Sequence, residues 1–293
     1  MEAAPKKQIT KKQHFVPQFY LRNFTDQAGQ LHIFDVENKR RSSPKGPSSV
    51  CHEHFFYAEE TGSPDDLSQE IEAYFAQDVE DPLSRELPEL ITKIRDGKQV
   101  SETDKYALAI LMNHMWLRGP AMRAMINRTS EVAVRKISQF RYSSQSIDDE
   151  LRTIATKSGA VLTDDEIAEI KSTVLENEYD LNFSNAQHLR FMLDSEHIRG
   201  FANLFFGQYW ILYINRSNRQ FITSTNPVTV ILPERKSFYG PTFLERTHLF
   251  PLAPDILIET RYPLNHNGKK LKRETLFKGS ESKVDELNFK IAS

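Results

Sequence analysis

Apolar side chains recur at helical spacing near the start of the chain. Val16, Tyr20 and Phe24 are four residues apart, which places them on one face of a helix. Pro17 suits the first turn of a helix, because its missing N–H needs no partner there. The pattern predicts a short helix that ends near residues 25–29.

Strand-forming residues follow this helix. Residues 30–36 alternate in the manner of a strand, and residues 37–39 are a plausible turn into a second strand at 40–42. The Ser- and Pro-rich stretch 42–49 is typical of a loop, and residues 50–58 predict another short strand.

The middle of the chain has the period of helices. Amphipathic runs predict a helical block over residues 64–207, with Ser63 and Pro64 starting its first helix. The predicted helices begin at about residue 65 and around Leu90, and then cover 102–118, 121–140, 164–175 and 186–206.

Strand patterns return after Gly207. Residues 209–214 are apolar on both faces, so we expect a buried central strand with residues 221–224 as its hairpin partner. Further strands are predicted at about 228–232, 247–252 and 256–260, and a final helix at 282–291.

This order of elements predicts the fold class α+β. The central helical block lies between N- and C-terminal β segments, which we expect to form one mostly antiparallel sheet. We interpret residues 1–12 as a mobile basic arm. Residues 13–293 are then a single domain made of an N-terminal helix and hairpin (13–60), the helical block (64–207) and the C-terminal strands (208–293).

The composition excludes several classes of protein but does not indicate a catalytic or binding activity. The 293 residues are 39% hydrophobic, which is enough for a sizeable core, and the formal net charge is only −2. One cysteine excludes a disulfide scaffold. No apolar stretch reaches the roughly 18–20 residues that cross a bilayer, and residues 1–10 lack the apolar core of a secretory signal. We therefore expect a cytoplasmic protein that does not bind membranes.

Charge is unevenly distributed along the helical block. Residues 118–141 contain six basic residues and one acidic residue, whereas residues 148–180 contain ten acidic and three basic ones. Two solvated helix faces that neutralise each other would explain this pattern. The alternative is that the basic helix faces an anionic ligand, with Arg118 and Arg123 brought together by the break at Gly119-Pro120.

Two short segments could carry chemistry. His52 and His54 would share one face of a strand and could bind a metal, but no recognised ligand spacing accompanies them, so we expect neither a metal nor another cofactor. His14 lies just before the first helix, where it could act as an acid or base or only anchor the helix start.

The third candidate is the polar segment at the end of the predicted hairpin of residues 209–224. Thr223, Ser224, Thr225 and Asn226 gather three hydroxyls and one carboxamide at a strand end, where binding loops are common. The alternative is a turn in which these side chains bind their own backbone. No Gly-rich nucleotide motif and no G-x-S-x-G motif is present.

Together these segments resemble the bacterial family named domain of unknown function 4238. Residues 12–24 (KQHFVPQFYLRNF) resemble its opening motif, and residues 117–120 with Arg123 resemble its helical arginine segment. Residues 221–228 are similar to its Thr-Ser-Asp-Asn-Pro motif, and residues 250–254 and Asn288 also fit. The resemblance spans nearly the whole chain but implies no settled activity.

The resemblance implies importance for particular positions. They are His14, Pro17, Tyr20, Arg118, Arg123, Ser224, Asn226 and Pro227. The sequence departs from the family pattern at Thr225, where aspartate is typical. A catalytic aspartate would be lost by this change, whereas a turn-forming one can be replaced by the threonine hydroxyl.

Three hypotheses follow from these residues. The first is a metal-independent phosphodiesterase or ribonuclease, with His14 as general acid or base and arginines stabilising the phosphate charge. The second is a non-catalytic module that binds a nucleotide, an anionic metabolite or a protein partner. The expected partner is RNA or another anionic ligand. The third is a purely structural role for the motifs. The candidate catalytic residues are His14, Arg118, Arg123, Ser224 and Asn226, and the candidate binding residues are Tyr20, Arg22, Arg128, Thr223 and Thr225.

Overall fold

The structure is a computed structural model that describes residues 10–57, 59–60, 67–68, 70–232, 246–261 and 274–292. Its residues divide into two compact units, one made of 1–122 with 188–293 and the other of 123–187. This division does not test whether 13–293 fold as one domain, so that stays a prediction. Most of the predicted mobile arm lies outside the described residues, but Lys12 belongs to strand β1 (Lys12–His14).

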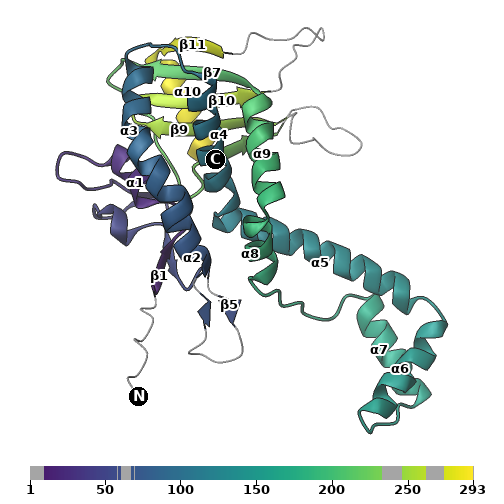
Figure 1. Ribbon diagram of the computed structural model, residues 1–293. Helices are drawn as coiled ribbons and strands as arrows, with labels where there is room; N and C mark the ends of the chain where they lie inside the picture. The colour runs from purple at the N-terminus through teal and green to yellow at the C-terminus, as the bar shows by residue number, and fades with distance from the viewer. Residues whose placement is uncertain are drawn as a thin grey trace, which may run out of the picture. The chain divides into compact units, whose positions relative to one another are not determined.

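A five-stranded sheet forms the centre of the first unit (Figure 1). Its order is β11-β7-β10-β9-β8, and β11 alone runs parallel to its neighbour. The strands are β7 (Tyr209–Asn215), β8 (Thr229–Ile231), β9 (Thr247–Ala253), β10 (Ile256–Arg261) and β11 (Glu274–Gly279). Trp210, Leu212 and Ile214 are each at most 5% exposed, which confirms that β7 is a buried central strand.

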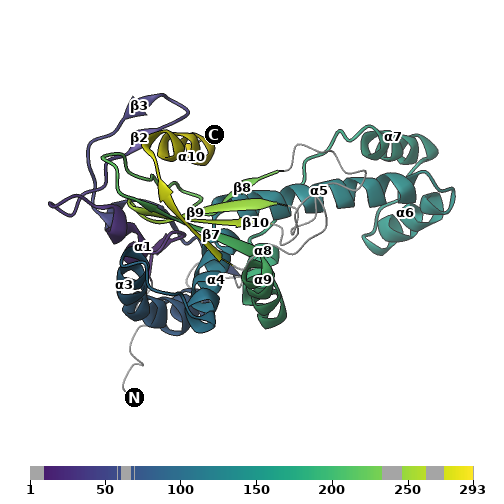
Figure 2. The ribbon, with the colours of Figure 1, turned by 90° about the horizontal axis from the view of Figure 1, so that it is seen from above.

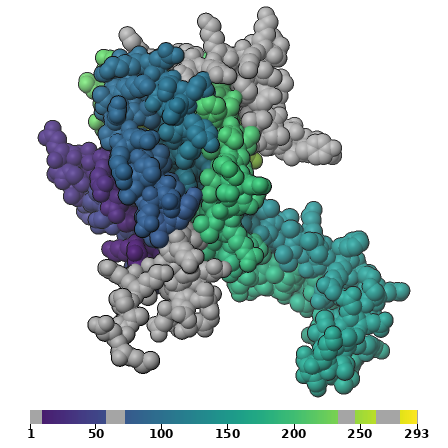
Figure 3. Space-filling model, viewed as in Figure 1, coloured from purple at the N-terminus to yellow at the C-terminus, as the bar shows by residue number. Residues whose placement is uncertain are grey.

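Helices cover both faces of this sheet (Figure 2). Helix α10 (Glu281–Ala292) packs Val284, Leu287 and Ile291 against alternate residues of the strands. Figure 2 shows α3 (Asp81–Arg95), α4 (Glu102–Leu117) and α9 (Ser195–Gly207) on the other face. In the space-filling view, the blue side chains of α3 and α4 adjoin the green ones of α9 (Figure 3). The fold is therefore α+β, as the order of predicted elements indicated.

Two pairings predicted from the sequence are wrong. Residues 221–224 form no strand, because β7 pairs with β10 and β11 instead. The N-terminal strands do not join the large sheet: β1 pairs with β4 (His52–His54), and β2 (Phe34–Asp35) pairs with β3 (Arg40–Arg41). Both edge strands of the large sheet, β8 and β11, come from the C-terminal part of the chain.

The N-terminal segment nevertheless contacts the C-terminal sheet. The first helix is a single turn, α1 (Gln18–Leu21), followed by the 3₁₀ turn η1 (Arg22–Phe24). The Tyr20 hydroxyl donates to the Pro251 carbonyl oxygen at 2.6 Å, and Asn23 Nδ2 donates to the Leu252 carbonyl oxygen at 3.3 Å. The predicted meeting of the two ends of the chain is confirmed, although through side chains and not through a shared sheet.

The predicted helical block is confirmed with changes of detail. Ser63 and Pro64, the predicted helix start, lie outside the described residues, and the first described helix of the block, α2, begins at Glu70. Asp194 breaks the predicted helix 186–206 in two, because its carboxylate caps the N–H groups of Glu196 and His197. The remaining segments are α2 (Glu70–Tyr74), the π-helical η3 (Phe75–Glu80), α5 (Pro120–Tyr142), α6 (Ser146–Lys157), α7 (Asp164–Leu175) and α8 (Ala186–Leu193).

The second unit has a small core of its own. Ile147, Leu151 and Ile167 are buried together where α6 and α7 meet. Thr163 starts α7 with a reciprocal pair of hydrogen bonds to Glu166, and this capping box explains why the predicted boundaries of that helix hold. None of the helices in the described residues is long and apolar enough to span a membrane.

Candidate active site

Arg118, at the end of α4, has an enclosed guanidinium group. Nε donates to the Tyr57 hydroxyl at 3.0 Å, Nη1 to the Glu80 carboxylate at 2.7 Å and Nη2 to the His14 carbonyl oxygen at 2.6 Å. The Phe75 ring lies 4.5 Å from the guanidinium carbon. All three nitrogens are therefore engaged within the protein.

Burial and partners act in opposite directions on the Arg118 charge. Burial alone lowers the pKa of Arg118, but the neighbouring Tyr57 and Glu80 outweigh it and hold the pKa above its ordinary value. The group stays charged and fixes two neighbours, the His14 backbone and the Glu80 side chain. Arg118 is thus placed to position other residues and not to contact a ligand itself.

His14 carries an available imidazole nitrogen. Its Nε2 is buried and has no hydrogen-bond partner in the part of the chain that the structure describes. Burial lowers the pKa of His14, nearby His52 and Arg118 lower it further, and hydrogen bonding to the Ser48 backbone opposes them. His14 lies in β1, where it is paired with His52 of β4. At neutral pH the ring is uncharged and can accept a proton.

Glu72, in α2, is the second titratable group of this region. Burial raises the pKa of Glu72 to about 7, Glu80 adds to the shift and Arg118 opposes it. Its Oε2 atom is buried and also lacks a partner among the described residues. Near neutral pH this carboxyl is therefore partly protonated, as a general acid requires.

Glu72 is absent from the candidates predicted from the sequence, although the sequence contains a signal for it. Glu72, Phe75 and Val79 are spaced i, i+3 and i+7, so the carboxyl lies on the stripe that buries Phe75 and Val79. A carboxyl group on an otherwise apolar stripe is seldom buried without a reason. The spacing alone therefore marks Glu72 as a candidate functional residue.

His14 and Glu72 line one pocket of about 280 Å³. Gln18, Phe19 and Arg22 complete the N-terminal wall, and the helical wall holds Ala76, Glu80, Asp81 and Ser84. The Glu80 carboxylate is neutralised by Arg118, and Asp81 lies 3.6 Å from Arg85. The exposed Arg22 guanidinium has no ion pair among the described residues, so it is the cation placed to meet an anion. The segment η3, which carries Glu80, is π-helical, a geometry frequent at functional sites.

The three motif segments converge beside this pocket. The Tyr20 hydroxyl lies 2.8 Å from Thr223 Oγ1, and Arg118 bonds the His14 backbone. Gly119 packs against the third segment so closely that a Cβ atom there would lie 3.2 Å from Asn226 Oδ1. Only glycine fits this approach without displacing its neighbour.

The other predicted site residues are placed differently. Ser224 and Asn226 form a turn, with Ser224 Oγ donating to the Asn226 carbonyl oxygen and accepting from its N–H. Thr225 is exposed in the same turn. Arg123 and Arg128 belong to the second unit, whereas His14 and Arg118 belong to the first. The catalytic and binding roles assigned to these residues stay predictions.

The cysteine–histidine segment shows no metal site. Across the described ranges, no group of three or more His, Cys, Asp or Glu side chains is arranged to hold a metal ion. Burial raises the pKa of Cys51 to about 11, so its thiol stays protonated near neutral pH.

The fold and the pocket define an α+β protein in which His14 of β1 and Glu72 of α2 line one pocket. The chain belongs to the family described as "Protein of unknown function (DUF4238)", whose model matches residues 12–293. This match confirms the resemblance carried by the three motifs. Neither the curated proteins nor the solved structures contain a match to the chain.

Proposed function

We propose that the His14 pocket cleaves phosphodiester bonds of RNA by general acid–base catalysis. The proposal rests on one observation: His14 and Glu72 line the same pocket, and each has a buried atom, His14 Nε2 and Glu72 Oε2, without a hydrogen-bond partner among the described residues. A buried polar atom without a partner costs free energy, so each group gains when a substrate hydrogen-bonds to it.

The two groups suit opposite proton transfers. Neutral His14 removes the proton from the ribose 2′-hydroxyl, whose oxygen attacks the adjacent phosphorus. Protonated Glu72 gives its proton to the departing 5′-oxygen as the phosphorus–oxygen bond breaks. The products are a 2′,3′-cyclic phosphate and a 5′-hydroxyl, with one proton gained by His14 and one lost by Glu72. RNA supplies the nucleophile itself, so two side chains complete the reaction.

Arginines have two separate roles in this proposal. Arg22, which lines the pocket and is exposed, binds the phosphate oxygens and stabilises the negative charge that develops on them. Arg118 is a positioning residue, because it holds the His14 carbonyl and keeps Glu80 charge-compensated beside Glu72. Tyr20 fixes α1, which carries Gln18 at the same pocket.

A non-catalytic binding site is the second candidate. The pocket of about 280 Å³ matches one nucleotide-sized group. A mononucleotide or a small anionic metabolite held by Arg22 is consistent with this volume. This candidate differs from the first in predicting binding without turnover.

A cleavage assay with matched variants tests the proposal. Purified protein is incubated in EDTA with a single-stranded RNA oligonucleotide and with DNA of the same sequence. We expect cleavage of RNA only, with a 2′,3′-cyclic phosphate end detected by mass spectrometry. Loss of one acid or base typically reduces the rate by about 10²–10⁴-fold, so Glu72→Gln and His14→Ala should show losses of that order.

Exposed residues of the same type provide the controls. Glu89→Gln on α3 and His54→Ala on β4 lie outside the pocket and should keep the wild-type rate. Binding of a mononucleotide without RNA cleavage would favour the second candidate. Equal cleavage of DNA, or full activity in Glu72→Gln, would contradict the proposed mechanism.

A further inference from the structure

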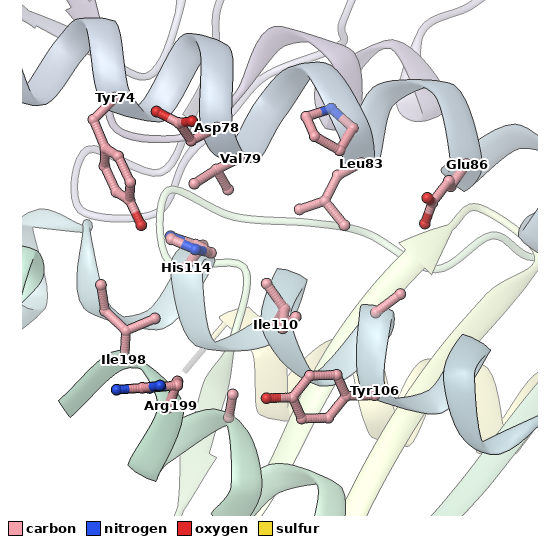
Figure 4. Close-up of a pocket in the computed structure, with 13 residues that line it drawn as sticks. Tyr74, Asp78, Val79, Leu83, Glu86, Tyr106, Ile110, His114, Ile198 and Arg199 are labelled. Atoms are coloured by element: carbon pink, nitrogen blue, oxygen red, sulfur yellow. The ribbon is translucent and has the colours of Figure 1, made fainter. Parts of the chain in front are cut away.

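A second pocket, of about 310 Å³, is lined by the continuous helical segment made of α2, η3 and α3 (residues 70–95) (Figure 4). This segment also lines the His14 pocket, but with another face. The His14 pocket takes residues 72, 76, 80 and 84 of this segment, whereas the second pocket takes 74, 78, 82 and 86. Helices α4 and α9 form its other walls. The two pockets share no lining residue, so a ligand of the second does not occupy the first.

The walls of this pocket are mainly aliphatic. Val79 comes from η3, Leu83 from α3, Ile110 from α4 and Ile198 from α9. Figure 4 shows these side chains on opposite sides of the pocket. Facing aliphatic surfaces favour a flat ligand, because both faces of such a ligand lose contact with water.

Neutral polar groups are set into these apolar walls. His114 is 5% exposed, and no hydrogen bond to its ring is found in the part of the chain described. Burial lowers the pKa of His114 to about 3, and nearby Arg118 acts in the same direction. The ring is therefore neutral and offers one donor and one acceptor. The Tyr74 and Tyr106 hydroxyls line the same space, and Figure 4 shows the Tyr74 side chain extending toward His114.

We infer that this pocket binds a neutral, planar nitrogen heterocycle of purine size. A heterocycle of this kind places ring nitrogens and amino groups at its edge, where His114 and the tyrosine hydroxyls can meet them. Its faces pack against the aliphatic walls. The exposed charged residues of the pocket are two carboxylates, Asp78 and Glu86, and one guanidinium, Arg199, so their net negative charge disfavours an anion. The inference does not depend on catalysis at His14.

Adenosine is the probe for this inference, with naphthalene as a size-matched comparator that lacks hydrogen-bonding groups. Binding to the Glu72→Gln protein is followed by ligand-observed NMR, so turnover at the other pocket cannot interfere. We expect adenosine to bind, and His114→Phe to weaken it about tenfold by removing both ring nitrogens. Tyr74→Phe, which keeps the ring and lies at the half-buried mouth, is the second variant and should weaken binding severalfold.

A blocking variant locates the bound probe. Ala107→Trp places an indole in the pocket and should abolish adenosine binding, whereas Ala168→Trp on exposed α7 should leave it unchanged. Circular dichroism and thermal melting verify that each variant is folded. Absence of adenosine binding to the folded parent protein, naphthalene binding of equal strength, or binding that survives Ala107→Trp would each overturn the inference.

Discussion

Arg118 in the first unit and Arg141 in the second both form an ion pair, but in different surroundings. The Arg118 side chain is 2% exposed and bonds Glu80, Tyr57 and the His14 backbone. The Arg141 side chain is 60% exposed and bonds Glu150 alone among the contacts described. Both belong to the same basic stretch of sequence. The comparison teaches that neighbouring basic residues in a sequence can have different roles. One arginine can be buried and hold other residues in place, whereas another forms an exposed ion pair that contributes little to stability.

The largest expected effect on the free energy of unfolding is that of replacing the buried Arg118. Arg118→Met leaves Glu80 unpaired and removes the donors to Tyr57 and the His14 carbonyl. Breaking a buried pair in this way costs about 3–5 kcal/mol of unfolding free energy. Chemical denaturation followed by circular dichroism measures it, with the exposed Arg128→Met as the matched control. A loss below about 1 kcal/mol would show that the scaffold role is wrong.

A smaller effect is expected at Tyr20, whose hydroxyl donates to Pro251 and contacts Thr223. Tyr20→Phe leaves the buried carbonyl without this donor, which costs about 1–3 kcal/mol of unfolding free energy. Tyr179→Phe is the control, because its hydroxyl is buried without a partner in the described part of the chain. Denaturation should show Tyr179→Phe to be neutral or slightly stabilising. Equal losses in the two variants would mean that the Tyr20 hydrogen bonds contribute nothing.

The raised pKa of Glu72 should make the free energy of unfolding decrease as the pH rises. Its pKa is about 7 in the folded protein and near 4.5 when unfolded, so its contribution is fully present below pH 4.5 and is lost as pH rises through 7. Glu72→Gln removes this loss. Discounted for partial solvent screening, the variant should exceed wild type by about 1 kcal/mol at pH 8. Denaturation at pH 5 and pH 8 measures the difference, and a gap that does not grow with pH would contradict the raised pKa.

The smallest effect is expected at the exposed pair. Arg141→Ala should leave the denaturation midpoint unchanged within error, because solvent and salt screen its interaction with Glu150. The same measurement at low and high salt makes the test sharper. A clear destabilisation at both salt concentrations would remove the contrast with Arg118.

Local patterns explain which elements the sequence predicted well. The apolar run of β7 and the capping box of α7 each lie within a few consecutive residues. The positions of these two elements could therefore be predicted from the local sequence. The parallel pairing of β11 with β7 joins residues more than sixty positions apart and leaves no local mark. The break at Asp194 was visible only as a capping residue inside a helical period.

The candidate site was predictable in part for the same reason. His14 and the three motifs were identified from the sequence, and the structure brings their segments together. Whether a charged side chain can contact a ligand depends on how far it is buried. Burial results from packing between segments that are distant in the sequence, so it cannot be predicted from neighbouring residues. Arg118 was expected to face a ligand, yet its three nitrogens bond within the protein. Glu72 lies on an apolar stripe, and its shifted pKa arises from surroundings that the tertiary fold creates.

The rate of RNA cleavage as a function of pH tests the central claim most directly. The account requires neutral His14 and protonated Glu72 in the same molecule. The rate should therefore rise as His14 loses its proton below pH 6.5 and fall as Glu72 loses its proton near pH 7. Glu72→Gln should abolish most activity across the range. A rate that keeps rising above pH 8, or no cleavage in EDTA at any pH, would contradict the acid–base role of this pocket.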